Sequence, residues 1–446
     1  MYKQRKSLTA LQTLAIGFAL IIIIGALFLM LPISNKNQSL SFLDALFTST
    51  SATCVTGLVV CDTYTQFTFF GQAVILCLIQ IGGLGFMTVA VLFSLVLRKR
   101  IGLKERSYLM EAVSSLQLGG VVRFARRILI GTAIIEGLGA ALLLLRFAPL
   151  FGFKTGLWYA VFHSVSAFCN AGFDLMGRIE PGSSLIHFIN DPLVLIVIMS
   201  LIVIGGIGFL VWDDLAEHKW HIHRYLLHTK IMLCATFILL VGSAALFFVL
   251  EGNASMAGMT MGEKIISSAF MAVTPRTAGF NTVDLTTMTE AGTSLSSLLM
   301  FVGAGAGSTG GGVKVTTVAT ILLTTFFCMR GREDVNAFHR RISEGLVRRA
   351  FCSMVFYVML AMVGCFILLV EQKGISLSNA LFETLSAIGT VGLSRAGTGT
   401  MTDISRITLL VLMYAGRVGS LSVAMAFADR KHPIALRNTL GKVIVG

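Results

Sequence analysis

The sequence predicts an all-α polytopic membrane protein with four pseudo-symmetric repeats around one central pore and eight transmembrane spans. The chain of 446 residues is 55% hydrophobic and 13% charged, whereas about 25% of residues are charged in a typical soluble domain. Its apolar segments approach or exceed the roughly 20 residues that a bilayer span needs. Eight such segments lie at 9–31, 73–97, 128–150, 192–212, 230–250, 295–328, 350–370 and 405–428. A short glycine-containing sequence also occurs four times, once within each successive pair of segments.

The first apolar segment is predicted to be a membrane span rather than a cleaved signal peptide. Lys3, Arg5 and Lys6 precede it, as basic residues do in signal peptides. However, the apolar run continues to Leu31, and no small-residue cleavage site is clear. We therefore expect this segment to begin the first repeat.

Between the two spans of each pair lies a less apolar stretch of about 12 residues, which is too short to span. These stretches are 42–53, 157–169, 262–274 and 377–388. Irregular backbone at membrane depth must be buried in protein or face water, so each stretch is predicted to be a re-entrant pore helix that turns back at a glycine loop. The expected divisions are repeats at 1–119, 120–225, 226–345 and 346–429 and a C-terminal tail at 430–446.

Each loop contains a glycine followed by Phe or Leu, and these glycines are 115, 107 and 113 residues apart. A ring of backbone carbonyls can replace the water around an alkali cation, and glycine adopts the required backbone angles at little steric cost. The pore helices end at the loops, so their partial negative charge favours a cation. Ordinary glycine turns are the alternative. The candidate filter residues are Thr53, Cys54, Val55, Thr56 and Gly57; Cys169, Asn170, Ala171 and Gly172; Arg276, Thr277, Ala278 and Gly279; and Gly389, Thr390, Val391 and Gly392.

Basic residues are distributed unequally between the two expected sides of the membrane. With the N-terminus inside, the inner segments carry 24 Lys and Arg and the outer segments carry nine, while Lys314 and Arg417 remain within helices. This bias predicts cytoplasmic N- and C-termini and glycine loops that face outside. It also accounts for the net charge of +13 without a nucleic-acid partner.

The second span of the third repeat is expected to be broken. Its apolar run, 295–328, is too long for one straight span, and residues 303–312 include six glycines. Each glycine in a helix costs about 1 kcal/mol relative to alanine, so a loop beneath the filter is predicted. The glycine motifs at 81–86 and 204–209 are interpreted instead as close helix contacts. A phosphate-binding loop is disfavoured because Lys314 follows valine and no strand precedes the glycines.

This arrangement resembles the Trk/Ktr/HKT superfamily of potassium transporters, and most of all its KtrB-type membrane subunit. The resemblance covers nearly the whole chain and rests on one key glycine in each loop, at Gly57, Gly172, Gly279 and Gly392. It implies potassium preference, because the first position is serine in some sodium-selective relatives. The pairs Cys169–Asn170 and Arg276–Thr277 depart from the fuller Thr-Val-Gly pattern.

In the resembled family the broken span contains an intramembrane gating loop. A charge at mid-membrane usually faces a cavity or a partner, and we hypothesise that Arg417, which matches the family's last-repeat arginine, donates to carbonyls of the loop and holds it closed. Lys314 is assigned either to the gate or to a structural contact. The candidate gate residues are Gly303, Gly305, Gly307, Ser308, Thr309, Gly310, Gly311, Gly312, Lys314 and Arg417.

The resemblance further implies a homodimer in the lipid of the cell membrane, seated on a separate cytosolic ring of nucleotide-binding subunits of the KtrA type. Potassium is then the transported ion, sodium is left open as an activator or coupling ion, and no cofactor is expected. An ion-coupled transporter of a small organic solute is the alternative, but it predicts broken helices in inverted pairs. An enzyme would need paired intramembrane acids or histidines. Only Glu136 appears, and a helix-packing hydrogen bond is expected for it.

Overall fold

The computed structural model describes residues 10–36, 40–85 and 120–419 of the chain. Within these ranges the regular structure is almost entirely helical, which confirms the predicted fold class. The exceptions are a small antiparallel sheet of β1 (Asn336–Ala337) and β2 (Arg340–Arg341). Short 3-10 turns lie at Pro32–Ser34, Met176–Arg178, Ile186–Phe188, Ile222–Arg224, Leu285–Thr287 and Thr398–Thr400, and a single helical turn, α3, lies at Thr63–Gln66.

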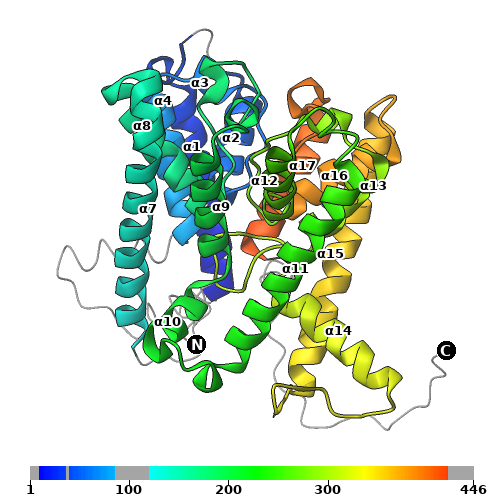
Figure 1. Cartoon of the computed structure of the whole chain (residues 1–446). Helices are drawn as coiled ribbons and strands as arrows, with labels where there is room; N and C mark the ends of the chain where they lie inside the picture. Colours follow the sequence, from blue (N-terminus) through cyan, green and yellow to red (C-terminus); the bar gives the residue numbers. More distant parts are fainter. Residues whose placement is uncertain (1–9, 37–39, 86–119, 420–446) are drawn as a thin grey trace, which may run out of the picture.

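Four long helices each begin one of the expected repeats (Figure 1). They are α1 (Ala10–Met30), α7 (Val121–Phe151), α11 (Leu227–Glu251) and α15 (Glu344–Glu371). In the described part of the chain these four are long and apolar enough to cross a membrane, and a bent pair described below brings the number to five. Many of their apolar side chains are exposed, as membrane lipid requires; Val249, for example, is 77% exposed.

Four shorter helices follow them and correspond to the predicted pore helices. They are α2 (Phe42–Cys54), α8 (Phe153–Phe168), α12 (Met261–Val273) and α16 (Leu377–Ile388). Hydroxyl side chains start three of these helices, because Ser41, Thr260 and Ser376 each accept a hydrogen bond from the backbone N–H three residues later. Each helix also buries phenylalanine completely, at Phe47 in α2, Phe162 and Phe168 in α8, Phe270 in α12 and Phe382 in α16.

The second helices of the repeats are shorter than the predicted spans. They are α4 (Phe69–Leu84), α9 (Pro192–Gly206), α13 (Glu290–Phe301) and α17 (Asp403–Val418), and two of them continue after a break as α10 (Phe209–His218) and α14 (Val315–Met329). The break in the third repeat, between α13 and α14, was predicted. The break in the second repeat, where α9 and α10 are bent by 93°, was not.

The bend occurs at Gly208, whose φ of 101° lies in the left-handed region. Gly85 and Gly419 end α4 and α17 with similarly positive φ angles of 79° and 92°. The predicted continuations of these two spans to residues 97 and 428 lie outside the described residues. The count of eight spans therefore stays a prediction.

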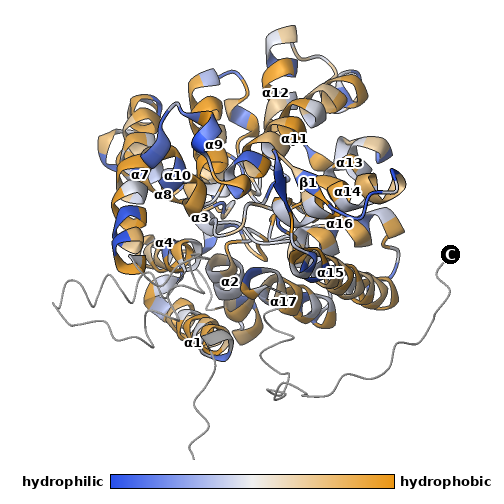
Figure 2. Cartoon of the chain, turned by 90° about the horizontal axis from the view of Figure 1, so that it is seen from below, coloured by the Kyte–Doolittle hydropathy of each residue, from blue (hydrophilic) through white to orange (hydrophobic). Residues whose placement is uncertain are grey.

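The second helix of each repeat packs against the pore helix of the next repeat. The pairs are α4 with α8, α9 with α12, α13 with α16, and α17 with α2. The last pair closes the circle, and Figure 2 shows the helices arranged around a centre that loops occupy. Long-range hydrogen bonds secure this closure: Tyr414 donates to the Ala15 carbonyl at 2.7 Å, and Arg406 donates to Asp44 at 3.0 Å.

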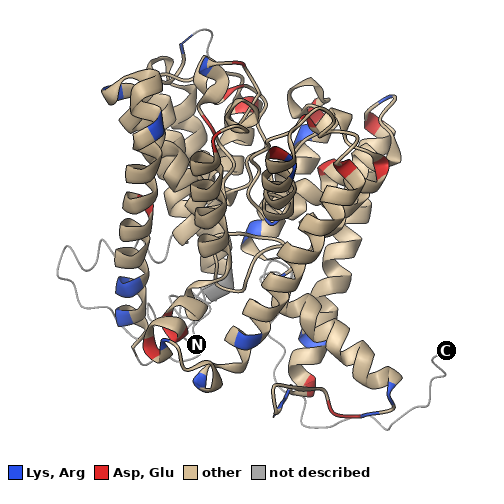
Figure 3. Ribbon diagram, in the orientation of Figure 1, with Lys and Arg blue, Asp and Glu red and all other residues tan. Residues whose placement is uncertain are grey.

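Glycines in the second helices allow this close packing. A methyl group added at Gly82 would collide with the Thr53 carbonyl oxygen, and one at Gly205 would collide with that of Phe168. The interpretation of the two glycine motifs as close helix contacts is thus confirmed at Gly82 and Gly205. Figure 3 shows that charged residues lie mainly near the two ends of the bundle, with few in the middle.

Candidate ion path

The four glycine loops share one backbone conformation. A residue with positive φ ends each pore helix, at Val55, Asn170, Thr277 and Thr390, and the glycine two residues later also has positive φ, between 69° and 95°. In three loops a serine carbonyl of the pore helix accepts the N–H of the residue before the glycine, at 2.7 to 2.8 Å. In the third loop the N–H of Ala278 donates instead to the Thr274 carbonyl, which is four residues back rather than five. These bonds turn the chain sharply at the end of each pore helix.

The structure brings the four glycines together in a closed ring. A methyl group built on Gly57 would lie 2.5 Å from the carbonyl oxygen of Ala171, and one on Gly172 would lie 2.7 Å from that of Ala278. Gly279 stands in the same relation to the Val391 carbonyl at 2.6 Å, and Gly392 returns to the Thr56 carbonyl. Each glycine therefore lies against the residue that precedes the glycine of the next loop, and no side chain would fit between them.

The other candidate filter residues lie beside or behind this ring. Thr53 and Cys54 complete the last turn of α2, and Cys169 and Gly389 follow the ends of their pore helices. The side chain of Arg276 extends to α11, where it donates to the Thr236 hydroxyl at 3.3 Å. The structure thus gathers the backbone of all four loops, while the Arg276 guanidinium points elsewhere.

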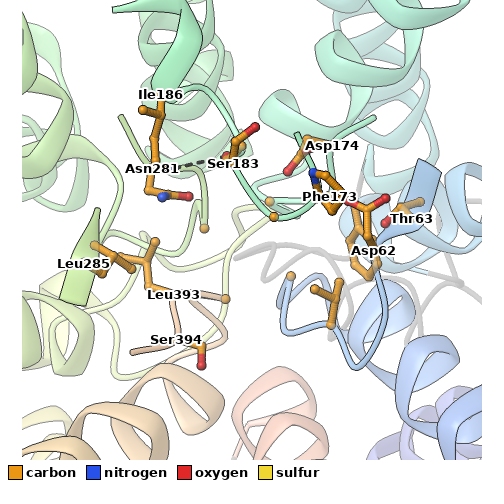
Figure 4. A pocket seen from close by; sticks show the side chains of 18 of the residues that line it. Asp62, Thr63, Phe173, Asp174, Ser183, Ile186, Asn281, Leu285, Leu393 and Ser394 are labelled. Carbon is orange, nitrogen blue, oxygen red and sulfur yellow. Dashed lines mark hydrogen bonds between the residues drawn. The ribbon is translucent and has the colours of Figure 1, made fainter. Parts of the chain in front are cut away.

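A cavity of about 490 Å³ opens above the ring, and all four glycines line it. Among the described residues its lining includes the acidic Asp62, Asp174, Glu180 and Asp284 but no Lys or Arg. Figure 4 shows Asp62 and Asp174 together on one wall of this cavity. Burial raises the pKa of Asp174 to about 7, the backbone N–H of Met176 partly opposes this, and the nearby charge of Asp62 adds to the rise.

Residues 302–314, here called the intramembrane loop, lie against the opposite side of the ring. The Thr309 hydroxyl is 3.3 Å from the Asn170 side-chain amide, and the N–H of Gly311 donates to the Thr390 hydroxyl at 3.0 Å. A methyl group at Gly310 would collide with the Thr277 hydroxyl. The loop therefore contacts three of the four filter loops directly.

The intramembrane loop is also bonded to the broken second span of the second repeat. The N–H of Gly305 donates to the Gly206 carbonyl at 2.8 Å, and the N–H of Phe209 donates to the Gly307 carbonyl at 2.9 Å. The bend at Gly208 thus exposes backbone groups that the loop satisfies. The two breaks therefore lie side by side and supply each other with hydrogen-bond partners.

Two basic side chains donate hydrogen bonds to carbonyl groups of the loop. Arg417 donates to the carbonyl of Thr309 in the loop and to those of Gly82 and Gly83 at the end of α4, the last at 3.0 Å. Lys314 donates to the Gly310 carbonyl at 2.9 Å. The guanidinium thereby joins the first, third and fourth repeats through one group.

Comparison with known proteins agrees with this architecture. Residues 3–434 match the model of the TrkH family, described as cation transport proteins. The chain belongs to this family.

Two relatives cover nearly the whole length. The chain is 41% identical to the Ktr system potassium uptake protein B of Bacillus subtilis, over 98% of this chain and 96% of the relative. It is 38% identical to the potassium/sodium uptake protein NtpJ of Enterococcus hirae, over 95% of this chain and 93% of that relative. The crystal structure of the potassium transporter TrkH from Vibrio parahaemolyticus covers 96% of this chain and 86% of its own, with a TM-score of 0.75 and 18% identity, which shows a shared fold.

The chain is thus a multi-pass membrane protein of the TrkH family. Beside the ring it also carries a polar residue that sequence reasoning missed. The carboxylate of Glu383 in α16 is fully buried and accepts hydrogen bonds from Ser394 and from the backbone N–H groups of Arg395 and Ala396, at 2.7 to 2.9 Å. It fixes the chain that leaves the fourth loop. The expected packing bond of Glu136 is confirmed, because the Gln80 amide donates to it at 3.1 Å.

The position of the second break had a signal in the sequence. The motif Ile-Gly-Gly-Ile-Gly-Phe at 204–209 has a third glycine, and it is this residue, Gly208, that takes the left-handed conformation. The same third glycine occurs at Gly85 and ends α4. The approach of Asp62 to Asp174 depends on the paths of two separate loops, and no local pattern indicates it.

Proposed function

We propose that this chain is the ion-translocating subunit of a potassium uptake system in the cell membrane. The observation that carries the proposal is the closed ring of four loops, in which the carbonyl oxygen before each glycine lies against the glycine of a neighbouring loop, at the negative ends of four pore helices. Such a ring supplies several oxygen dipoles to a dehydrated cation. Three relatives at 36% identity or more are named for potassium or potassium/sodium uptake, which supports the same ion.

In this proposal the ion enters the acidic cavity from outside, loses its water at Gly57, Gly172, Gly279 and Gly392, and passes when the intramembrane loop moves aside. Arg417 and Lys314 hold that loop closed. Both termini are cytoplasmic, and the division into four repeats and a C-terminal tail follows the predicted boundaries. Two copies of the chain assemble on a cytosolic nucleotide-binding ring, which supplies regulation, and sodium acts either as an activator or as a coupling ion. Nothing in the described residues favours the organic-solute alternative.

Growth of a bacterium that lacks its own potassium uptake tests the function. Expression of the chain together with a cytosolic Ktr partner is expected to restore growth at low potassium. Flux of potassium, rubidium and sodium into liposomes that contain the purified chain, with and without the partner, separates ion selectivity from regulation. Failure to restore growth with the partner present, in cells that contain the folded chain, would count against the proposal.

Shortening the intramembrane loop tests its role as a gate. Deleting residues 305–312 removes the segment whose carbonyls Arg417 and Lys314 bind. We expect rubidium flux without the partner to rise several-fold in liposomes, because the obstruction below the ring is gone. An elution volume equal to that of the unmodified chain on size-exclusion chromatography serves as the folding control. Unchanged flux in a folded variant would show that the loop is no gate.

External pH is expected to change uptake through Asp174. Since its pKa is raised to about 7, the side chain is neutral below this pH and gains its negative charge above it. One charge about 8 Å from an ion in water changes its energy by about 0.5 kcal/mol, so rubidium uptake at subsaturating concentration should roughly double from pH 6 to pH 8. Asp174→Asn should abolish this rise. Because histidine can also titrate in this range, His187→Gln, which removes the partner of Glu180, is the matched control and should retain the rise.

A further inference from the structure

An apolar groove lies between α11 and α14, outside the ion path. Its volume is about 500 Å³, and apart from Cys234 every described side chain that lines it is a hydrocarbon. It extends from Val302 and Val315, at the two ends of the intramembrane loop, to Ala337 and Phe338 in the β1–β2 hairpin. Ile238 and Leu322 in its walls are 62% and 64% exposed. The groove is therefore open along two helices that cross or enter the membrane.

The dimensions of the groove fit one acyl chain. Along α11 it extends from Ile231 to Leu239, which is about 12 Å at 1.5 Å per helical residue. One leaflet of the hydrocarbon layer is about 15 Å thick. An open apolar groove of this length in the hydrocarbon layer is solvated by lipid, and its concave shape holds one chain more firmly than the flat faces around it.

The end of the groove beside the hairpin is basic. Arg340 pairs across the hairpin with Ala337, which lines the groove, and its side chain is exposed. Among the described residues Arg340 has no acidic partner, whereas its neighbour Arg341 is paired with Asp334 at 2.9 Å. Lys230 directly precedes the groove residue Ile231 on α11. Basic residues beside an apolar site at the cytoplasmic surface favour anionic headgroups.

We propose that this groove binds one acyl chain of an anionic phospholipid, with the headgroup at Arg340 and Lys230. The bound chain contacts both ends of the intramembrane loop, at Val302 and Val315. Val302 is paired with Val313 across the base of the loop, and Val315 is buried against Met232 of α11. Occupancy of the groove thus stabilises the arrangement of α11 and α14 that keeps the loop beneath the ring.

Native mass spectrometry of the purified full-length chain measures binding directly. With phosphatidylglycerol and phosphatidylcholine offered at equal concentration, we expect preferential retention of one phosphatidylglycerol per chain. Ala319→Phe, which fills the groove, and Arg340→Gln should each reduce that retention at least fivefold. The matched controls, Val358→Phe on the exposed face of α15 and Arg349→Gln at its inner end, should leave it unchanged. Equal retention of the two lipids, or no loss in Ala319→Phe, would overturn the proposal.

Native Cys234 offers a second measurement that needs no substitution in the groove. In a variant whose other exposed cysteines, Cys77, Cys328 and Cys352, are serine, phosphatidylglycerol should slow maleimide labelling of Cys234 at least threefold relative to phosphatidylcholine. A variant that keeps Cys352 alone should be labelled at equal rates in both lipids. Efficient cross-linking of Cys234 between two copies would instead assign the groove to a protein interface and overturn the lipid assignment.

The effect on the loop rests on the proposed transport function and is measured separately. Rubidium flux without the partner should be at least threefold higher in phosphatidylcholine liposomes than in liposomes with phosphatidylglycerol, and Arg340→Gln should remove this difference. If flux is equal in both lipid compositions while phosphatidylglycerol still binds, the coupling to the loop is rejected and the proposed binding site stands. No flux under any condition would reject the transport function alone.

Discussion

Replacing Gly57 with serine is expected to lower the preference for potassium over sodium about tenfold. Gly57 has a φ of +95°, and a side chain there lies 2.5 Å from the Ala171 carbonyl oxygen. A non-glycine residue held in such a conformation costs about 1–3 kcal/mol, and 1.4 kcal/mol corresponds to a factor of ten. The substitution therefore displaces a carbonyl of the ring. Competition between rubidium and sodium in liposome flux measures the change.

Gly182→Ser is the matched control for this prediction. Gly182 also has a positive φ, of +78°, and lines the same cavity, but nothing lies within 4 Å of a methyl group built there. It should leave ion preference unchanged. Gly57→Ala separates the added carbon from the hydroxyl and should resemble Gly57→Ser if displacement of the Ala171 carbonyl is the cause. An unaltered ion preference in folded Gly57→Ser would mean that the other three glycine loops determine selectivity.

Replacing Arg417 with glutamine should produce flux that no longer depends on the cytosolic partner. The guanidinium donates to Thr309 in the intramembrane loop and to Gly82 and Gly83 at the end of α4. A hydrogen bond from a charged group contributes about 1.5–3 kcal/mol. Loss of the bond to the loop alone should therefore shift the ratio of open to closed loop by about tenfold or more. Rubidium flux in liposomes without partner measures the shift.

Arg417→Lys distinguishes a gate from a simple structural contact. Lysine keeps the charge but lacks the planar fork that reaches carbonyls on two elements at once, so intermediate flux is expected. Arg406→Gln is the control, because this arginine on the same helix pairs with Asp44 on the side of the acidic cavity. If Arg417→Gln and Arg406→Gln lose thermal stability equally and neither leaks, Arg417 has a structural role only.

The sequence predicted those features that local chemistry determines. The pore helices were found within a few residues, because each combines limited apolar length with a following glycine that needs positive φ. The meeting of Arg417 with the broken span followed from the cost of an unpaired charge in a membrane. Its second contact, to Gly82 and Gly83, was not predicted, since it depends on where α4 ends.

Features that depend on contacts between repeats were harder to predict from the sequence. The three glycines of 204–209 are compatible with tight packing and with a bend, and both occur: Gly205 packs on Phe168 while Gly208 breaks the helix. The break is stable because the N–H of Phe209 finds the Gly307 carbonyl, about 100 residues further along the chain. The sequence alone does not specify that pairing.

The closure of the ring has a consequence for how the protein is made. The hydrogen bonds of α17 to α1, from Tyr414 to Ala15, and to α2, from Arg406 to Asp44, join residues that are 399 and 362 positions apart. A ribosome adds about 5–20 residues per second, so α2 must wait for roughly 20 seconds or more, beside α1 and α4, before its final neighbour is synthesised. Until then the polar face of α2 that α17 will cover has no helix packed against it. Insertion of the last repeat is thus the step that completes assembly, and chains that stop before α17 are expected to be targets of membrane quality control.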